Sequence, residues 1–276
     1  MFNNENDKRS SSSGFTVENA LRAFSYLMKK DFKKYMTVAM PIAIGIIGIG
    51  YIFFRDLASI PDVSGLSPEQ QLEIYLPYWQ RAVLNMIMIS VLCALPIGSI
   101  SFGVMQGFRG ESYSIRESIL VVQKYLAASV IACVIAVISI NIGFFFLFLP
   151  GFILVILFIP VVPVCILEQR GALSALKRSI TLMASFQIGL KAFLLVFMLW
   201  LLFFLFQNII VILLQDIFYL RMALVILLEG LWIVSMSVLT AVIYFYILSE
   251  KEHKNADYIA RQIFQTDKAD YDGSDD

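Results

Sequence analysis

One carboxylate lies inside the last long apolar segment of the chain. Glu229 is the only charged residue of the stretch 222–249, and an ionised carboxylate is costly to hold in hydrocarbon without a partner. Asn208 lies 10 residues before Phe218, where we expect a turn, and Glu229 lies 11 residues after it. Two antiparallel helices would therefore bring Glu229 to the depth of Asn208 and its neighbour Gln207.

A fourth polar side chain, Asn141, is predicted at the same level. It lies 8 residues before Leu149, where we expect another turn on the same side, and thus about 12 Å inward at the helical rise per residue. Two interpretations of this polar layer stay open. The four side chains hydrogen-bond to one another and hold the helices together, or they line a cavity open to the outside. In the second case Glu229 binds a cation or a proton, and the amides orient a substrate headgroup.

The apolar segments contain no set of residues suited to catalysis. Nucleophile–base pairs, paired carboxylates and metal sites need titratable side chains on facing helices, and the expected spans contain no histidine, no aspartate and one glutamate. Cys93, Cys133 and Cys165 lack the spacing of metal ligands, and the single histidine, His253, follows the last apolar run. We expect a protein that is not an enzyme and that has no metal or cofactor.

The composition indicates that lipid is part of the solvent. Hydrophobic residues form 59% of the 276 residues and charged residues 15%, with a mean hydropathy of +0.79, which is more apolar surface than one core could bury. The formal net charge of 0 does not favour a nucleic-acid partner. The expected partner is the lipid bilayer.

The lengths of the apolar runs predict an all-α integral membrane protein with six transmembrane helices. A bilayer needs about 20 apolar residues per helix. The third and fourth spans share one charge-free run, in which Leu149, Pro150 and Gly151 predict a tight turn. The expected spans are 36–54, 82–108, 125–148, 151–167, 192–215 and 222–249.

The positions of Lys and Arg predict the orientation, because cytoplasmic segments near span ends retain them. With the N-terminus inside, the inner segments hold 18 of the 21 basic residues. We therefore expect a disordered cytoplasmic tail at 1–14, a membrane domain at 15–249 and a cytoplasmic tail at 250–276, acidic at its end. In the outer loop, Ser67 and Pro68 predict the start of a short helix.

Three related stretches precede alternate spans, at 15–32, 113–126 and 171–186. They predict three hairpins, each preceded by a cytoplasmic amphipathic helix in the membrane interface. In the second stretch Ser114 and Glu117 have the spacing of a capping box, which marks a helix start.

The first of these stretches has an apolar face followed by a basic end. Residues at helical spacing form the face: Val17, Leu21, Phe24 and Met28. Four lysines follow, and we expect them to contact anionic lipid headgroups: Lys29, Lys30, Lys33 and Lys34. Alternatively, these lysines serve only as the basic flank that sets the orientation of the first span.

Small residues recur every fourth position in the second and third spans, a pattern typical of close helix packing. They are Ser99, Gly103, Gly107, Ala128, Ala132 and Ala136. Prolines that would kink or interrupt spans suit a gated pathway as well as an irregular fold. They are Pro41, Pro96, Pro160 and Pro163.

The stretch 149–183 matches a family pattern at eight positions: Leu149, Pro150, Gly151, Glu168, Gly171, Ala172, Ala175 and Ser179. It resembles the membrane-domain superfamily that includes the YciC-type bacterial inner-membrane proteins and the membrane domain of some glycerophosphodiester phosphodiesterases. The resemblance implies a six-span protein of the bacterial cytoplasmic membrane. It implies no catalytic activity, because no soluble segment is long enough to form the phosphodiesterase domain.

Three functions fit these observations. We favour a non-enzymatic membrane protein that handles lipids or other amphiphiles, or supports the cell envelope. The first alternative is a transporter or channel-like permease with a polar intramembrane site. The second is a membrane scaffold or assembly factor that uses the acidic end of the tail, 267–276, as a docking segment; disorder is the plainer interpretation of that tail.

Overall fold

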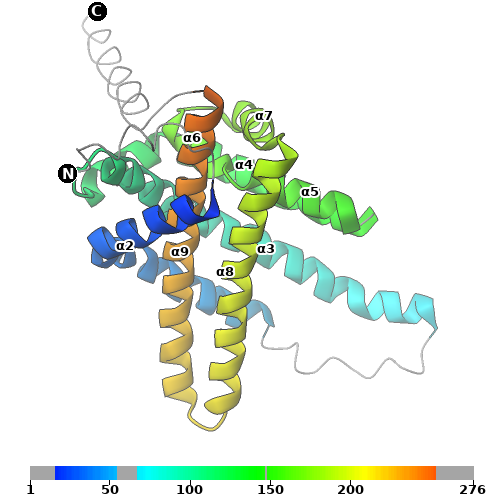
Figure 1. Cartoon of the computed structure of the whole chain (residues 1–276). Helices are drawn as coiled ribbons and strands as arrows, with labels where there is room; N and C mark the ends of the chain where they lie inside the picture. Colours follow the sequence, from blue (N-terminus) through cyan, green and yellow to red (C-terminus); the bar gives the residue numbers. More distant parts are fainter. Residues whose placement is uncertain (1–15, 55–66, 147, 253–276) are drawn as a thin grey trace, which may run out of the picture.

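The computed structural model describes residues 16–54, 67–146 and 148–252, and all regular structure within them is helical (Figure 1). The helices are α2 (Val17–Phe54), α3 (Pro68–Phe108), α4 (Ile115–Phe146), α5 (Phe148–Phe158), α6 (Val161–Leu167), α7 (Ala172–Met183), α8 (Phe186–Leu213) and α9 (Phe218–Glu252).

Six helical stretches in the described residues are long and apolar enough to cross a membrane, which confirms the predicted all-α, multi-pass fold. Five are the single helices α2, α3, α4, α8 and α9. The sixth is α5 followed by α6, interrupted at Pro160, whose ring removes a backbone N–H from the helical pattern. The first part of the expected outer loop, 55–66, and both chain ends, 1–15 and 253–276, lie outside the described residues.

Helix α2 bends sharply at Asp31, where the backbone is non-helical (φ −125°, ψ 21°). The segment before the bend, 17–30, crosses α9 (Figure 1), and the Tyr246 hydroxyl of α9 donates to the Asn19 carbonyl at 3.1 Å. In the apolar face predicted for this segment, Val17 and Leu21 are exposed, whereas Phe24 and Met28 are partly buried. The position of this segment in a membrane interface stays a prediction.

Helix α3 begins as predicted but is much longer than the short helix that we expected. Ser67 caps it, with a reciprocal bond from the Ser67 N–H to the Gln70 side chain at 3.1 Å, and Pro68 occupies its first turn. The helix then continues for 41 residues to Phe108. Pro77 does not end it, since losing one backbone hydrogen bond costs less than breaking a long apolar helix.

Helix α5 starts before the residues that were expected to form a turn. Leu149, Pro150 and Gly151 lie in its first turn. A proline is tolerated there, because the backbone N–H groups of the first turn have no hydrogen-bond partner within the helix. Residue 147, between α4 and α5, lies outside the described residues. Gly143 of α4 and Gly151 lie so close that a Cβ atom on Gly143 would be 2.9 Å from the Gly151 backbone. These two glycines allow the backbones of α4 and α5 to touch.

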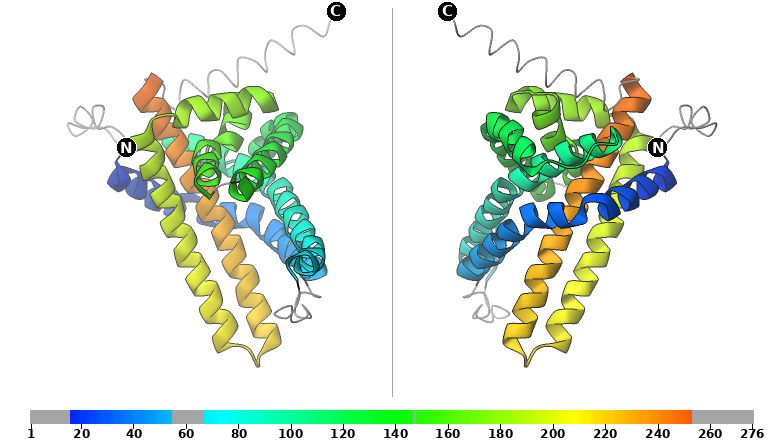
Figure 2. Two further views of the ribbon diagram at one scale, coloured as in Figure 1. Left: turned by 90° about the vertical axis from the view of Figure 1, so that its right-hand side faces the viewer. Right: turned by 90° about the vertical axis from the view of Figure 1, so that its left-hand side faces the viewer.

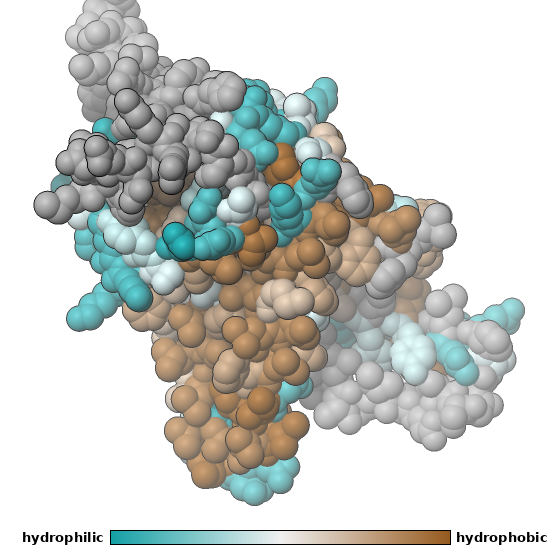
Figure 3. Space-filling view, viewed as in Figure 1, coloured by the Kyte–Doolittle hydropathy of each residue, from teal (hydrophilic) through white to brown (hydrophobic). Residues whose placement is uncertain are grey.

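The long helices spread from a shared buried end (Figure 2). Helices α8 and α9 run side by side in one direction, whereas α4 and α5 run across that direction (Figures 1 and 2). All seven residues of α6 are buried, as is most of the C-terminal half of α9. By contrast, only 6% of the most apolar stretch of α8 is buried inside the protein. Helices α8 and α9 form a hairpin, the α8–α9 hairpin. Figure 3 shows its apolar surface between hydrophilic patches at its two ends.

The small residues of α3 pack as expected. A Cβ atom on Gly103 would lie 2.5 Å from the Tyr113 ring, and one on Gly107 would overlap Leu27 of α2. On α4, Ala132 and Ala136 are buried. These positions let α2, α3 and the start of α4 approach closely, which supports a packing role for the pattern.

Candidate functional site

The α8–α9 hairpin contains a cavity of about 80 Å³ lined from both helices. Residues of α8 at i, i+3, i+4 and i+7 face residues of α9 at i, i+1 and i+4, so each set lies on one side of its helix. The lining residues are Trp200, Phe203, Phe204, Gln207, Leu228, Glu229 and Trp232.

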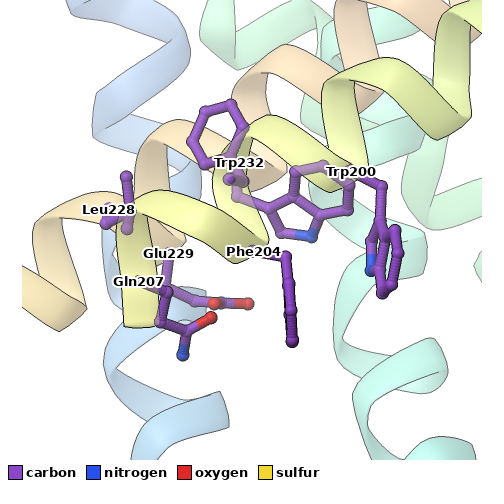
Figure 4. A pocket seen from close by; sticks show the side chains of 7 residues that line it. Trp200, Phe204, Gln207, Leu228, Glu229 and Trp232 are labelled. Atoms are coloured by element: carbon purple, nitrogen blue, oxygen red, sulfur yellow. The ribbon is translucent and has the colours of Figure 1, made fainter. Parts of the chain in front are cut away.

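Glu229 and Gln207 are the polar side chains of this cavity. They lie next to each other, and the Glu229 carboxylate points toward the Phe204 ring (Figure 4). Within the described part of the chain, Glu229 forms no ion pair with a basic side chain. It is therefore a partly buried acid without a protein countercharge in that part of the chain.

Aromatic rings form most of the remaining wall. Trp200 stacks with Phe204 at a centroid distance of 5.3 Å, and Phe203 packs against Trp232 at 5.3 Å. Trp200 is 45% exposed and Phe204 is 47% exposed. These two rings therefore line the cavity and also form part of the apolar outer surface of α8.

The structure brings together two of the four residues of the predicted polar layer. Glu229 and Gln207 share the cavity, whereas Asn208 donates to the Phe204 carbonyl of its own helix at 2.7 Å; Gln207 and Asn208 are both exposed. Asn141 likewise donates to the Val137 carbonyl of α4 at 2.8 Å. Neither asparagine lines the cavity.

The cavity contains too few ligands for a divalent metal ion. A calcium ion takes six to eight oxygen atoms, whereas the polar lining here is one carboxylate and one amide. A single positive charge on an organic group is a better match, because one carboxylate balances it and aromatic faces attract it.

A second polar cluster surrounds Glu168, one of the family-pattern positions. Glu168 is buried beyond the end of α6, and its carboxylate accepts from Arg170 at 2.7 Å, from Arg178 at 2.9 Å and from the Tyr244 hydroxyl at 3.2 Å. Arg178 also pairs with Glu252, near the end of α9. This cluster ties α6, α7 and α9 together, and sequence analysis did not foresee its members beyond Glu168.

The family-pattern positions on and next to α7 lie close to the same junction. Ser179 is buried and donates to the Leu157 carbonyl, next to the break between α5 and α6, at 2.6 Å. Gly171 caps α7, and Ala175 is fully buried. Pro150 starts α5. The structure gives each of these residues a role in packing or in helix ends.

Two of the four lysines expected at lipid headgroups bind the protein itself. Lys30 donates to the Glu111 carbonyl at 2.5 Å, and Lys34 donates to the Tyr113 carbonyl at 2.7 Å. Lys29 and Lys33 are exposed. Lys30 and Lys34 hold the segment between α3 and α4. Lys29 and Lys33 are therefore better placed to contact lipid headgroups.

A buried hydroxyl cluster fixes the same segment. The Tyr113 hydroxyl lies 2.5 Å from that of Ser99 and 3.1 Å from that of Ser118. Burial raises the pKa of Tyr113, although its hydrogen bonds to Ser118 and Ser99 oppose the rise. The phenol therefore stays neutral and can both donate and accept.

Helix α4 starts where the Ser114 pattern predicted, but Gln106 of α3 takes the capping role expected of Glu117. The Ser114 N–H donates to Gln106 Oε1 at 3.0 Å, and Gln106 Nε2 donates to the Glu117 carboxylate at 3.0 Å. A glutamine inside a span gave no sign of this role in the sequence.

Comparisons of the chain with family models, curated proteins and solved structures find no match. The family resemblance of the stretch 149–183 therefore stays a prediction.

Proposed function

We propose that this membrane protein binds an amphiphile, with the polar head in the cavity of the α8–α9 hairpin and the apolar chain on the outer surface of α8. The observation that supports this function best is the combination of the Glu229 carboxylate, which has no basic partner among the described residues, with half-exposed aromatic walls.

The size and depth of the cavity suit such a ligand. A volume of about 80 Å³ accommodates a small headgroup but not an acyl chain. Gln207 lies six residues before the end of α8, or about 9 Å from it. A headgroup held there would place its chain among the exposed apolar side chains of α8, the surface that we expect to face lipid.

The cellular setting of this proposal is the bacterial cytoplasmic membrane, with both chain ends in the cytoplasm. The distribution of basic residues supports this orientation, and the family resemblance supports the membrane. In this proposal the protein acts by binding the headgroup through the carboxylate and the amide that line the cavity.

Native mass spectrometry of the full chain tests this function. Protein extracted from membranes in mild detergent should retain an amphiphile. Leu228→Phe, which fills part of the cavity, should lose it. Leu227→Phe is the matched control, because Leu227 is 50% exposed and does not line the cavity. Absence of a retained amphiphile, or equal loss in both variants, would refute the proposed function.

A further inference from the structure

We propose that the cavity selects amphiphiles whose headgroup is an organic ammonium. This inference rests on the proposed function and adds the chemical class of the ligand. Its basis is the juxtaposition of Glu229, Gln207 and four aromatic rings within one small cavity.

The sign of the charge follows from Glu229. Its carboxylate has no basic partner within the described residues, and the cavity lining contains no lysine or arginine. An anionic headgroup would meet repulsion from a carboxylate in a medium of low dielectric constant. A cation restores neutrality at the place where an isolated negative charge is most costly.

The aromatic rings distinguish an organic ammonium from a metal ion. The faces of Trp, Phe and Tyr attract cations through the ring quadrupole, most strongly for Trp and most effectively where water is excluded. Trp200 and Trp232 both line the cavity, together with Phe203 and Phe204. Methyl groups or hydrogens on the ammonium would contact these rings, whereas a metal ion would need more oxygen ligands than Glu229 and Gln207 provide.

Gln207 complements the carboxylate. Its side chain lies beside Glu229 in Figure 4, so its amide oxygen can accept from an N–H group bound to the carboxylate. Gln207 therefore favours a headgroup with at least one N–H bond, while the rings accept a methylated one. An ammonium group can belong to a membrane amphiphile or to a free amine, and the experiment below separates the two sources.

Tryptophan fluorescence measures binding in the cavity. The chain has three, and two of them, Trp200 and Trp232, line the cavity. A Trp79→Phe background therefore restricts the fluorescence to the cavity. The full chain in a neutral maltoside detergent is titrated with dodecyltrimethylammonium, dodecylammonium, dodecanoate and tetramethylammonium.

We expect saturable fluorescence changes with both dodecyl ammonium ions, at concentrations at least about tenfold lower than for dodecanoate. Glu229→Gln should weaken this binding about tenfold, and Asn208→Ala, on the neighbouring residue outside the cavity, should not. If Glu229→Gln alters the far-UV circular dichroism, a second pair applies. Phe204→Leu should weaken binding severalfold, while Phe146→Leu, which changes an exposed ring on α4 away from both the cavity lining and α8, should leave it unchanged.

The outcomes separate the two proposals. Equal binding of the ammonium and carboxylate amphiphiles would refute ammonium selection and leave amphiphile binding intact. Binding of tetramethylammonium as tight as that of its dodecyl analogue would support the ammonium site and refute an amphiphile as its ligand. If no probe changes the fluorescence, both proposals are wrong.

Discussion

The Nε atom of Arg178 on α7 lies 2.9 Å from a carboxylate oxygen of Glu168, whose side chain is buried at the end of α6. Arg178 pairs with Glu252 as well, which joins the ends of α7 and α9. The hydrogen bond with Glu252, reinforced by Glu168, raises the pKa of Arg178 against the opposing effect of its burial. The guanidinium therefore stays charged and holds the buried end of the molecule together.

Replacing this arginine should destabilise the protein strongly. Arg178→Ala leaves Glu168 buried with less positive charge around it, and we expect a loss of about 3 kcal/mol in the free energy of unfolding. Arg170→Ala is the control, since Arg170 is more exposed, and it should cost about 1 kcal/mol or less. Thermal denaturation in detergent, followed by circular dichroism, measures both. Equal losses would contradict the central role of Arg178.

Sequence analysis could not have assembled this cluster. Glu168 and Arg170 are close in sequence, and the short α6 positions both. Glu252 and Tyr244, however, come from the last helix, more than 70 residues away. Their position beside Glu168 and Arg178 depends on how α9 packs against α6 and α7, which no local sequence pattern specifies.

The contact between α4 and α5 gives a second prediction. Gly143→Ala should destabilise the protein by about 1–3 kcal/mol, because the added methyl group meets the Gly151 backbone, which cannot rotate away. Gly48→Ala is the matched control. A Cβ atom there meets nothing within 4 Å, so the change should stabilise α2 by about 0.5–1 kcal/mol. Denaturation midpoints that shift in the same direction for both would be inconsistent with the close approach.

The lysines of α2 should separate into two functional pairs. Lys29→Gln with Lys33→Gln should reduce the number of anionic lipids retained by the purified protein, and added salt should reduce it further. Lys30→Gln with Lys34→Gln should leave lipid retention unchanged but lower stability by about 1 kcal/mol per lost hydrogen bond. Native mass spectrometry and thermal denaturation measure the two effects. Identical behaviour of the pairs would mean that Lys30 and Lys34 do not hold the 111–113 segment.

Topology provides a fourth prediction. Reporter fusions near residues 30, 115, 180 and 255 should be cytoplasmic, and those near 65 and 218 extracytoplasmic, because basic residues concentrate in the first set of segments. Phosphatase and fluorescent-protein reporters distinguish the two sides. An extracytoplasmic C-terminus would contradict the six-span arrangement.

The spans were predictable because each needs only length and low charge, which the sequence displays directly. Glu229 and Gln207 were correctly brought together, since α8 and α9 are joined by a short turn and run side by side. Asn208 does not line the cavity, and its amide instead donates to the Phe204 carbonyl of its own helix at 2.7 Å.

The level predicted for Asn141 depends on a further assumption. Counting residues from a turn gives a depth only when the helices share one direction, and α4 runs across the direction of α8 and α9 (Figure 2). The bend at Asp31 escaped prediction as well, because the residues around it form a continuous helical pattern without proline or glycine. The angles between the helices are set by tertiary packing, and the hydrophobic periodicity of the sequence gives no information about them.

The most direct test of the account is to locate a bound headgroup in the α8–α9 hairpin. A dodecylammonium analogue with a photoactivatable diazirine next to the nitrogen is crosslinked to the full chain, and the adducts are mapped by mass spectrometry. We predict adducts within 200–207 and 228–232, lost in Leu228→Phe and retained in Leu227→Phe. Adducts spread over the exposed residues of α8 and the other spans, and unchanged in Leu228→Phe, would contradict a headgroup site at Glu229.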